Sequence, residues 1–342
     1  MKKFKTTIFV LIALYTSSSL ACVHEYKSSL DKVGSLANKY FSHDGITYHE
    51  ASTFNFSSLK SEKSDKEFYV QEAHGLAAHS SGDYNDRYLE YYTYAHMNRF
   101  IESTRPQWKE KGYKIEIIGK SLEGRNLYSI FPSSISKTKK TILMYGRHHG
   151  DEGTANWIIE GFVNRLLAQN DNFFDEYQLI LYPMINPDGA EARRRYNSKG
   201  KDLNRVWYET PSRSLDEIQI IHKDVQKKVL AHEKMPVIAL DMHGSFTEDF
   251  IYRVSKTFKT PEFYNRQANF IAELGAKDIF QNGNAQTSNG HPKMGRILLV
   301  RDYGINALTH ETPRDIRKTG NRQISDLKQQ GIDVLSTIKQ LY

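Results

Sequence analysis

The chain has 342 residues, 39% of them hydrophobic and 25% charged, which is the balance of a globular protein with a sizeable core. Its formal net charge is +7, but no basic stripe with interleaved aromatic residues occurs, so we expect no nucleic-acid partner. Cys22 is the only cysteine, which excludes a disulfide within the chain.

Residues 1–21 are predicted to be an export signal. Lysines at positions 2, 3 and 5 precede an apolar run from Ile8 to Tyr15, and small residues follow up to Ala21. The run is too short to span a bilayer as a stable helix. We therefore expect an exported protein, periplasmic or extracellular, whose net charge falls to about +4 without these lysines.

Cys22 directly follows the expected cleavage point, and two interpretations stay open. The signal resembles a bacterial lipobox, in which this cysteine would carry a lipid, but Ser19 stands where leucine is usual. Plain soluble export is the alternative. Contact with a membrane is expected only through a lipid on Cys22, and the sequence leaves the oligomeric state open.

Residues 22–86 are predicted to be an N-terminal segment, to which we assign no role. The segment is polar and irregular, and Ser57 to Glu67 is a solvated, linker-like run. His74 and His79 flank an Ala-rich piece that favours a loop or short helix over a second metal site. One larger domain is expected over residues 87–342.

Within this domain, strands are predicted to alternate with helices. Strands are expected at 113–131 (a hairpin turning at 121–124), 141–145, 178–189, 237–245 and 304–313, and helices at 92–104, 153–169, 215–230 and 321–341. This alternation predicts an α/β fold, a mixed and mostly parallel central sheet with helices on both faces.

Polar side chains follow the ends of the apolar strands. His149 and Glu152 come after one strand, and Asn186, His243 and Glu311 lie at the ends of three others. In open α/β sheets the binding crevice lies at the carboxyl ends of strands. We therefore expect these five side chains to lie close together.

His149, Glu152 and His243 are the candidate ligands of one zinc ion per chain. Imidazole nitrogens and carboxylate oxygens are both good zinc ligands, and three protein ligands leave a fourth position for water. Zinc lowers the pKa of such a water toward ~7, which produces a nucleophile at neutral pH. Glu311 could accept the water's proton and pass it to a leaving amine.

The segment NPDGAEARRRYNSKGKDLNRVW, from Asn186 to Trp207, resembles the zinc carboxypeptidases of the carboxypeptidase A and B type. Four further motifs agree with that family in order: GKSLEGRNLY at 119–128, HGDE at 149–152, ALDMHGS at 239–245 and LTHETP at 308–313. The resemblance extends from about Tyr88 to the C-terminus. It implies a zinc carboxypeptidase-like catalytic domain over residues 87–342.

The resemblance also implies roles beyond the three zinc ligands. Glu311 would be the general base, and Arg195 would polarise the scissile carbonyl and stabilise the oxyanion. Asn204 and Arg205 would hold the terminal carboxylate of the substrate, for which the fork of an arginine is suited. The expected partner is therefore a peptide with a free C-terminal carboxylate.

Two assignments have rivals. Arg193 or Arg194 could take the place of Arg195, although only Arg195 fits the register R-x-N-x-x-G-x-D-L-N-R. His148 with Asp151 could replace His149 with Glu152, although the family motif runs through the second pair.

Two nearby residues are expected to be structural. His310 should point to the opposite face of its strand from Glu311, and Trp207 should be a wall residue.

The sequence departs from the family at two places. The animal enzymes have a mobile tyrosine some twenty residues before the catalytic glutamate, but no tyrosine occurs here from Gln286 to Arg296, and Tyr303 is out of register. His291 is a candidate to take the place of that tyrosine. Arg301 could lie at the base of the specificity pocket and favour an acidic terminal residue, in which case Arg301→Ala would relax that preference.

The predicted function is a zinc-dependent metallocarboxypeptidase, acting on peptides that could include cell-wall peptides. The alternative is a zinc deacylase or amidase of the succinylglutamate desuccinylase and aspartoacylase type, which shares the fold. A catalytically inactive binding module is a third hypothesis, against which the intact set of polar residues argues.

Overall fold

The computed structural model describes residues 39–41, 48–50, 92–168, 172–208, 216–232, 234–245, 248–277, 284–314 and 322–342. The chain divides into two compact units, residues 1–88 and 89–342. In the first unit β1 (Lys39–Phe41) pairs antiparallel with β2 (Tyr48–Glu50). The predicted signal, Cys22, Ser57 to Glu67, His74 and His79 lie outside the described residues.

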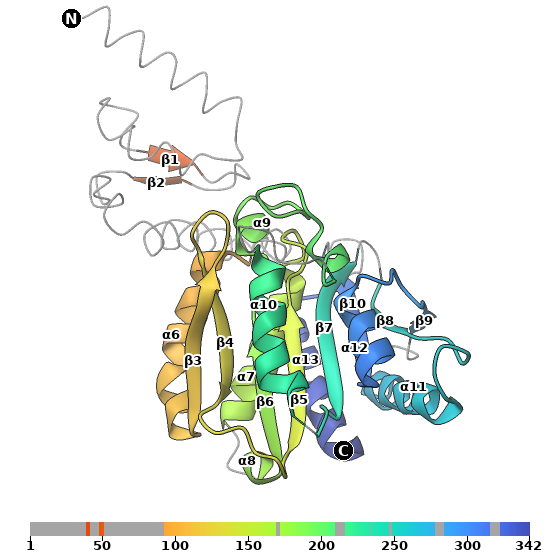
Figure 1. Ribbon diagram of the computed structural model, residues 1–342. Helices are drawn as coiled ribbons and strands as arrows, with labels where there is room; N and C mark the ends of the chain where they lie inside the picture. Colours follow the sequence, from red (N-terminus) through yellow and green to blue (C-terminus); the bar gives the residue numbers. More distant parts are fainter. Residues whose placement is uncertain are drawn as a thin grey trace, which may run out of the picture. The chain divides into compact units, whose positions relative to one another are not determined.

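The second unit is built on an eight-stranded sheet in the order β3-β4-β6-β5-β7-β10-β8-β9 (Figure 1). Its strands are β3 (Tyr113–Lys120), β4 (Asn126–Pro132), β5 (Lys140–Gly146), β6 (Tyr177–Tyr182), β7 (Ile238–Ser245), β8 (Phe250–Arg253), β9 (Ala285–Thr287) and β10 (Ala307–Pro313). The central pairs β6-β5, β5-β7 and β7-β10 are parallel. The pairs β3-β4, β4-β6 and β10-β8 are antiparallel, so the sheet is mixed as predicted.

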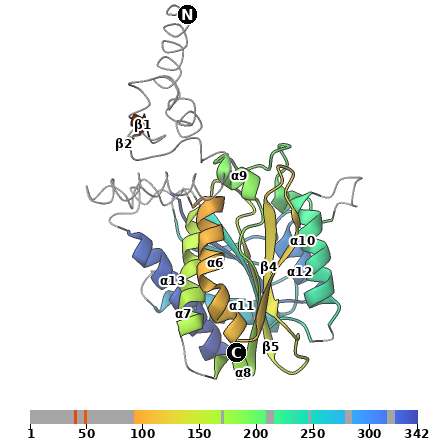
Figure 2. The ribbon, with the colours of Figure 1, turned by 90° about the vertical axis from the view of Figure 1, so that its left-hand side faces the viewer.

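Helices cover both faces of this sheet (Figure 2). One face packs against α6 (Tyr94–Glu110), α7 (Thr154–Ala168) and α13 (Ile324–Leu341), together with apolar residues of α11 (Pro261–Gly275). The other face packs against α10 (Glu217–Val225) and α12 (Gly295–Tyr303). Each face therefore has its own apolar core, which explains why the central strands are apolar on both sides.

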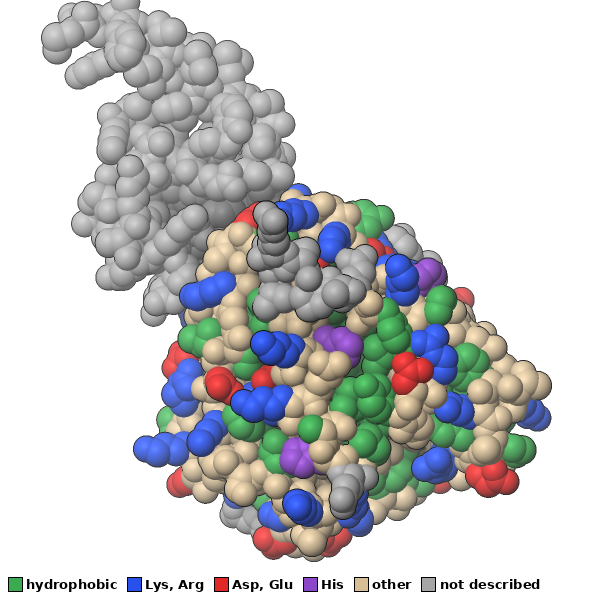
Figure 3. All heavy atoms as spheres, viewed as in Figure 1, with side chains coloured by type: hydrophobic (Ala, Val, Ile, Leu, Met, Phe, Trp, Pro, Cys, Tyr) green, Lys and Arg blue, Asp and Glu red, His purple; other side chains and the backbone are tan. Residues whose placement is uncertain are grey.

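Short helical segments complete the described fold. They are α8 (Phe173–Glu176), α9 (Pro187–Glu191), the 3₁₀ turn η4 (Leu203–Arg205) and the π turn η5 (Gln226–Leu230). Among the described helices, none is long and apolar enough to cross a membrane. On the face drawn in Figure 3, Lys and Arg side chains are interspersed with acidic and apolar ones.

The predicted α/β fold is confirmed, but several element boundaries differ. The first helix continues past Thr104 to Glu110, because Trp108 is fully buried and its ring lies 4.9 Å from that of Tyr113. The strand expected at 178–189 ends at Tyr182, since Pro183 follows and cannot donate to a ladder. Sequence reasoning assigned no elements between positions 246 and 303, where β8, α11, β9 and α12 lie.

Candidate metal centre

The centre is assembled where β5 and β7 end side by side. Their parallel register pairs Tyr145 with Asp241 and Gly146 with Met242. The turn that follows β5 therefore lies beside His243, the sixth residue of β7. The next strand, β10, pairs Glu311 with His243, so three strands contribute to one edge of the sheet.

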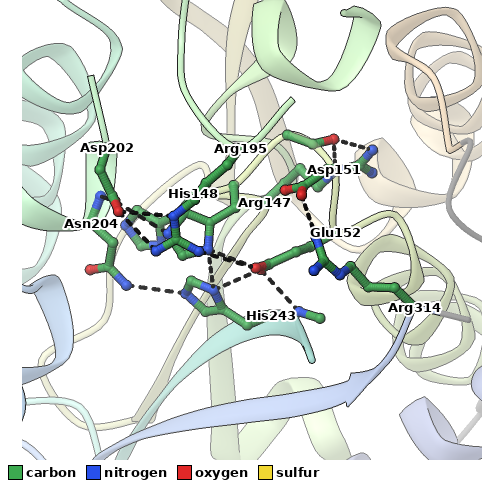
Figure 4. Close-up of polar contacts among 12 residues, drawn as sticks. Arg147, His148, Asp151, Glu152, Arg195, Asp202, Asn204, His243 and Arg314 are labelled. Atoms are coloured by element: carbon green, nitrogen blue, oxygen red, sulfur yellow. Dashed lines mark hydrogen bonds and ion pairs between the residues drawn. The ribbon is translucent and has the colours of Figure 1, made fainter. Parts of the chain in front are cut away.

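His149, Glu152 and His243 converge on one point. The Nδ1 atom of His149 lies 2.8 Å from Oε1 of Glu152, and Nδ1 of His243 lies 2.9 Å from Oε2 of the same carboxylate. The two Nδ1 atoms are 3.2 Å apart. Figure 4 shows Glu152 and His243 pointing toward one another, with the backbone amide of Gly244 donating to Glu152 at 3.0 Å.

This donor set fits zinc. Two nitrogen ligands of a tetrahedral zinc, each ~2.0 Å from the ion, are about 3.3 Å apart, close to the separation of the two imidazole nitrogens. One ligand atom from each of the three residues can be chosen so that all lie within 4.8 Å of one another. All three side chains are buried, so the ligands are held by the fold before a metal arrives.

The charges around the cluster are closely balanced. Burial disfavours the charged form of His243, but the carboxylates of Asp241 and Glu152 outweigh this and raise its pKa. Burial likewise opposes ionisation of Glu152, and the two histidines outweigh it and lower the pKa of that carboxyl group. The cluster thus favours a carboxylate between two imidazoles, an arrangement suited to a divalent cation.

A second trio, His148, Asp241 and His243, shares one residue with the first. His148 is committed elsewhere, because its Nδ1 faces Asp241 at 2.9 Å and its Nε2 accepts from Trp207 Nε1 at 2.9 Å. Asp241 also lies 2.9 Å from Nε2 of His243, so it orients that ring from behind. We therefore interpret Asp241 and His148 as supports of the centre.

Arg195 lies at the partly exposed side of the cluster. Its Nε and Nη2 donate to Oδ2 of Asp202 at 3.1 and 2.8 Å, and its Nη1 is 3.9 Å from Oε1 of Glu152. Asp202, which sequence reasoning missed, also lies 3.2 Å from Nε2 of His149. Burial opposes ionisation of Asp202, but His149 and Arg195 outweigh it and lower the pKa of this carboxyl group. Asp202 therefore links His149, a candidate zinc ligand, to Arg195.

Asn204 and Arg205 form the turn that borders the centre. The Nδ2 atom of Asn204 faces Nε2 of His243 at 3.2 Å, and its Oδ1 accepts from the amide of Gly295 at 3.1 Å. Arg205 is half-buried and its Nη1 donates to the carbonyl of Asn204 at 2.9 Å. The structure brings both residues to the site, while their contact with substrate stays a prediction.

Glu311 is beside His243 on the neighbouring strand, and the two share a face of the sheet. Burial raises the pKa of Glu311 to about 7, with His243 opposing the shift and Glu152 adding to it. A carboxyl group with a pKa in this range can both take and return a proton near neutral pH.

The turn between β5 and α7 is fixed by a buried arginine that sequence reasoning missed. Arg147 donates through Nε and Nη2 to the carbonyl of Gly150, at 2.9 and 2.8 Å, and through Nη1 to Asn156 at 2.8 Å. Asp151 in the same turn pairs with Arg314, which follows β10. Nothing in the sequence indicated that the side chains of Arg147 and Arg314 would point inward.

Other sequence candidates are placed away from the chemistry. Asn186 caps α9 by accepting from Gly189 and donates to the carbonyls of His148 and Arg195, so its role is to hold loops. His310 is buried on the opposite face, and His291 is exposed.

The suggestion that Arg301 forms a pocket base is wrong. Arg301 lies at the exposed end of α12, where it pairs with Asp302 and contacts the hydroxyl of Tyr208. The helix turn that carries it directs it to solvent, whereas Arg296 near the other end of the same helix is fully buried.

Comparison with known proteins identifies what this arrangement resembles. Residues 97–229 match the family model described as zinc carboxypeptidase. Cytosolic carboxypeptidase 2 of Mus musculus is 24% identical over 267 residues, which is 72% of this chain and 31% of that protein. The chain thus spans about a third of the length of this curated relative.

Solved structures show that the fold is shared. A putative carboxypeptidase A from Shewanella denitrificans has a TM-score of 0.63 at 19% identity, covering 74% of this chain and 69% of that one. A metallo-carboxypeptidase from Pseudomonas aeruginosa, in complex with (2-guanidinoethylmercapto)succinic acid, has a TM-score of 0.60 at 22% identity, covering 72% and 68%.

Proposed function

The chain contains a domain of the zinc carboxypeptidase family, and from this premise we propose that the protein is a zinc-dependent metallocarboxypeptidase that removes the C-terminal residue of peptides. The observation that carries the proposal is the convergence of His149, Glu152 and His243 beside Arg195 and Glu311. These are ligands, an oxyanion partner and a base within one site.

Zinc held by the three ligands would lower the pKa of a water molecule toward ~7 and polarise the scissile carbonyl. Glu311 takes a proton from the attacking water and passes it to the nitrogen of the leaving amine as the C–N bond breaks. Arg195 donates through Nη1 to the oxygen on which negative charge develops. Asp202 supports this role, because it accepts from the other two nitrogens of the guanidinium, Nε and Nη2.

Asn204 and Arg205 bind the terminal carboxylate of the peptide. Their position in one turn beside His243 supports this role, because the carboxylate must lie a single residue away from the scissile bond. This contact restricts the enzyme to C-terminal residues. Peptides of the cell wall and scavenged peptides both meet the requirement of a free terminal carboxylate.

The proposal is tested with the zinc-loaded protein and a panel of linear peptides, wall peptides and N-acyl amino acids, with products read by mass spectrometry. We expect loss of single C-terminal residues. Glu311→Gln should reduce kcat at least ~100-fold with little change in zinc content, whereas the exposed control Glu110→Gln should behave as the parent. Turnover of N-acyl amino acids alone, or equal activity in both variants, would contradict the proposal.

We further propose that the protein is exported, on the strength of the pattern in residues 1–21. Fractionation of cells that express the full chain tests this, and labelling with a fatty-acid analogue tests lipid on Cys22. A full-length, unprocessed chain found only in the cytoplasm would overturn export.

A further inference from the structure

Among the described strands, β3 is one edge of the eight-stranded sheet. The backbone amide of Ser133 donates to the carbonyl of Gly112 at 2.8 Å, which fixes the phase of the ladder between β3 and β4. In an antiparallel pair, alternate residues turn their N–H and C=O groups toward the partner strand. The backbone groups that point away from β4 are therefore those of Tyr113, Ile115 and Ile117.

These outward groups are available for pairing. No hydrogen bond joins them to another residue that the structure describes. The register with β4 is regular from Tyr113 to Ile117, and it shifts only between Ile117 and Gly119, where the strand has a bulge. Because bulges terminate pairing, the open part of the edge is Tyr113 to Ile117. Figure 2 shows α6 and α10 on either side of this edge.

The two faces of this segment differ in chemistry. Ile115 packs against the core on the side of α6, and Ile117, two residues on, shares that face and is 53% exposed. Lys114 and Glu116 belong to the opposite face, where Lys228 of η5 lies 2.8 Å from Glu116. One side of the edge is therefore apolar and the other is charged.

A basic hollow of about 760 Å³ surrounds the start of β3. Five of the described residues that line it are lysine or arginine, and Glu116 is the one acidic residue among them; the cations are Arg105, Lys109, Lys114, Lys227 and Lys228. A smaller hollow of about 200 Å³ shares Lys228 with it and adds Lys137 and Lys234. This surface therefore attracts negative charge.

Several of these cations are not neutralised within the described ranges. Arg105 pairs with Glu102, and Lys228 pairs with Glu116 and Asp224. No ion pair among the described residues involves Lys109, Lys114 or Lys227. The acidic residue of the hollow is thus already occupied by Lys228, while three exposed lysines remain for a partner.

Charge also argues against a second copy of this chain as the partner. Two β3 edges that paired with each other would bring two basic hollows together, and like charges that face each other across an interface are repulsive. An acidic partner has the complementary charge.

The hollow lies at the end of the sheet opposite the metal centre. Because β3 is antiparallel to β4 and β4 is antiparallel to β6, β3 runs in the same direction as β6 and β5. Tyr113 begins β3, whereas the candidate zinc ligands lie at the carboxyl ends of β5 and β7. A partner on this edge therefore leaves the metal centre accessible.

We propose that the open edge of β3 is a docking site for an extended segment of another protein in which acidic and apolar residues alternate. The segment adds a strand to the sheet, and its backbone pairs with Tyr113, Ile115 and Ile117. Its apolar side chains lie beside the two isoleucines, and its acidic side chains lie on the face of Lys114. This role goes beyond the proposed carboxypeptidase function and does not depend on it.

The test measures fluorescence anisotropy of a labelled peptide of alternating Glu and Val, mixed with the full chain. Its C-terminus is amidated, so that it offers no terminal carboxylate for hydrolysis. We expect saturable binding that weakens with added salt. Alternating Lys and Val should bind at least ~10-fold more weakly, because the charge is reversed. Alternating Glu and Pro, which keeps the charge but lacks every second N–H group, should also bind at least ~10-fold more weakly.

Variants of the protein test the same contacts from the other side. Ile117→Pro removes one outward N–H group and should weaken binding at least ~10-fold, whereas the matched control Ile117→Val should bind as the parent does. Lys114→Glu with Lys227→Glu should weaken binding to a similar extent. Lys256→Glu with Lys339→Glu, an equal change of charge at exposed positions on other elements, should have little effect.

Each result decides the proposal. Absence of saturable binding, equal binding of the Glu-Pro peptide, or equal binding by Ile117→Pro and Ile117→Val overturns strand addition. A parent that sediments as a dimer, becomes a monomer with Ile117→Pro and does not bind the peptide would assign the edge to a second copy instead. If Ile117→Pro does not fold, the three peptides compared on the parent still decide.

Discussion

Arg147 occupies the most constrained backbone position of the centre. Its φ of 64° is in the left-handed region, which side chains other than glycine rarely adopt. The side chain points inward, where three hydrogen bonds join it to Gly150 and Asn156. These hydrogen bonds hold the strained backbone in a fixed turn, and that turn carries His149 and Glu152.

Replacing Arg147 with methionine should weaken zinc binding by about 10- to 100-fold, the usual effect of losing groups that orient metal ligands. Competition with a chromophoric chelator would measure this directly. Arg165→Met, an exposed change on α7, is the control and should bind zinc as the parent does. Parental zinc affinity in a folded Arg147→Met protein would show that the turn does not depend on the hydrogen bonds of Arg147.

His310 makes stability depend on pH. It is fully buried between the neighbouring residues Met242 and Ile251, and burial lowers its pKa to about 4, with Asp249 and Arg322 as the nearby charges. Between pH 6.5 and 4 the unfolded chain binds a proton that the folded chain does not. The contribution of neutral His310 is therefore present above pH 6.5 and is lost as the pH falls.

We expect His310 to lower the free energy of unfolding by about 2 kcal/mol when the pH falls from 7 to 5. Urea unfolding of the parent and of His310→Gln at the two pH values isolates the effect, because all other titrating groups are common to both proteins. The parent should lose more stability than the variant. Equal losses would mean that His310 is protonated within the fold.

Among the elements, α7 and α13 make a very close crossing. A Cβ atom on Gly161 would lie 2.0 Å from the carbonyl oxygen of Lys328, and one on Gly331 would lie 2.0 Å from that of Ile158. The backbones can touch only because both positions are glycine. This close approach sets the position of α7, the helix that follows the metal-binding turn.

Gly331→Ala should therefore destabilise the protein by about 2–3 kcal/mol, the cost of forcing two well-packed elements apart. The decrease should be visible as a lower Tm in calorimetry. Ser336→Ala, on the exposed face of the same helix, adds no atoms at the crossing and should leave the Tm near that of the parent. A Gly331→Ala protein as stable as this control would contradict the packing argument.

At the scale of the whole molecule, residues 89–342 contain both apolar cores and every residue of the proposed site. The N-terminal end of this unit is anchored, because Tyr92 donates to Glu160 at 2.5 Å and the hydroxyl of Tyr94 accepts from the amide of Asn126 at 2.8 Å. A chain that begins at Leu89 keeps these contacts.

We expect residues 89–342 to fold cooperatively and to bind zinc with the affinity of the chain that begins at Val23. Circular dichroism melts and chelator competition on the two chains measure this. Aggregation of the shorter chain, or a large loss of zinc affinity, would show that residues 23–88 complete the second unit.

Much of the architecture could be predicted from the sequence because its signals are local. Apolar runs identified the central strands, and the polar residues at their ends indicated the edge at which His149, Glu152 and His243 meet. In the segment from β8 to α12, the short strands and α12 carry weak periodicity, which explains why they were missed. The amphipathic α11, which begins with the N-cap Thr260 and a proline, carried a readable signal that sequence reasoning overlooked.

By itself, the sequence determined the fold class, the resemblance to zinc carboxypeptidases and the residue types that can hold zinc. Only the tertiary structure decided which charged side chains point inward. Arg147, Asp241 and Arg296 are buried and Asp202 is half-buried, and their placement follows from strand register and helix packing over long sequence distances. Arg296 and Arg301 show the difference, because two arginines on one helix are distinguished only by the sheet that one of them faces.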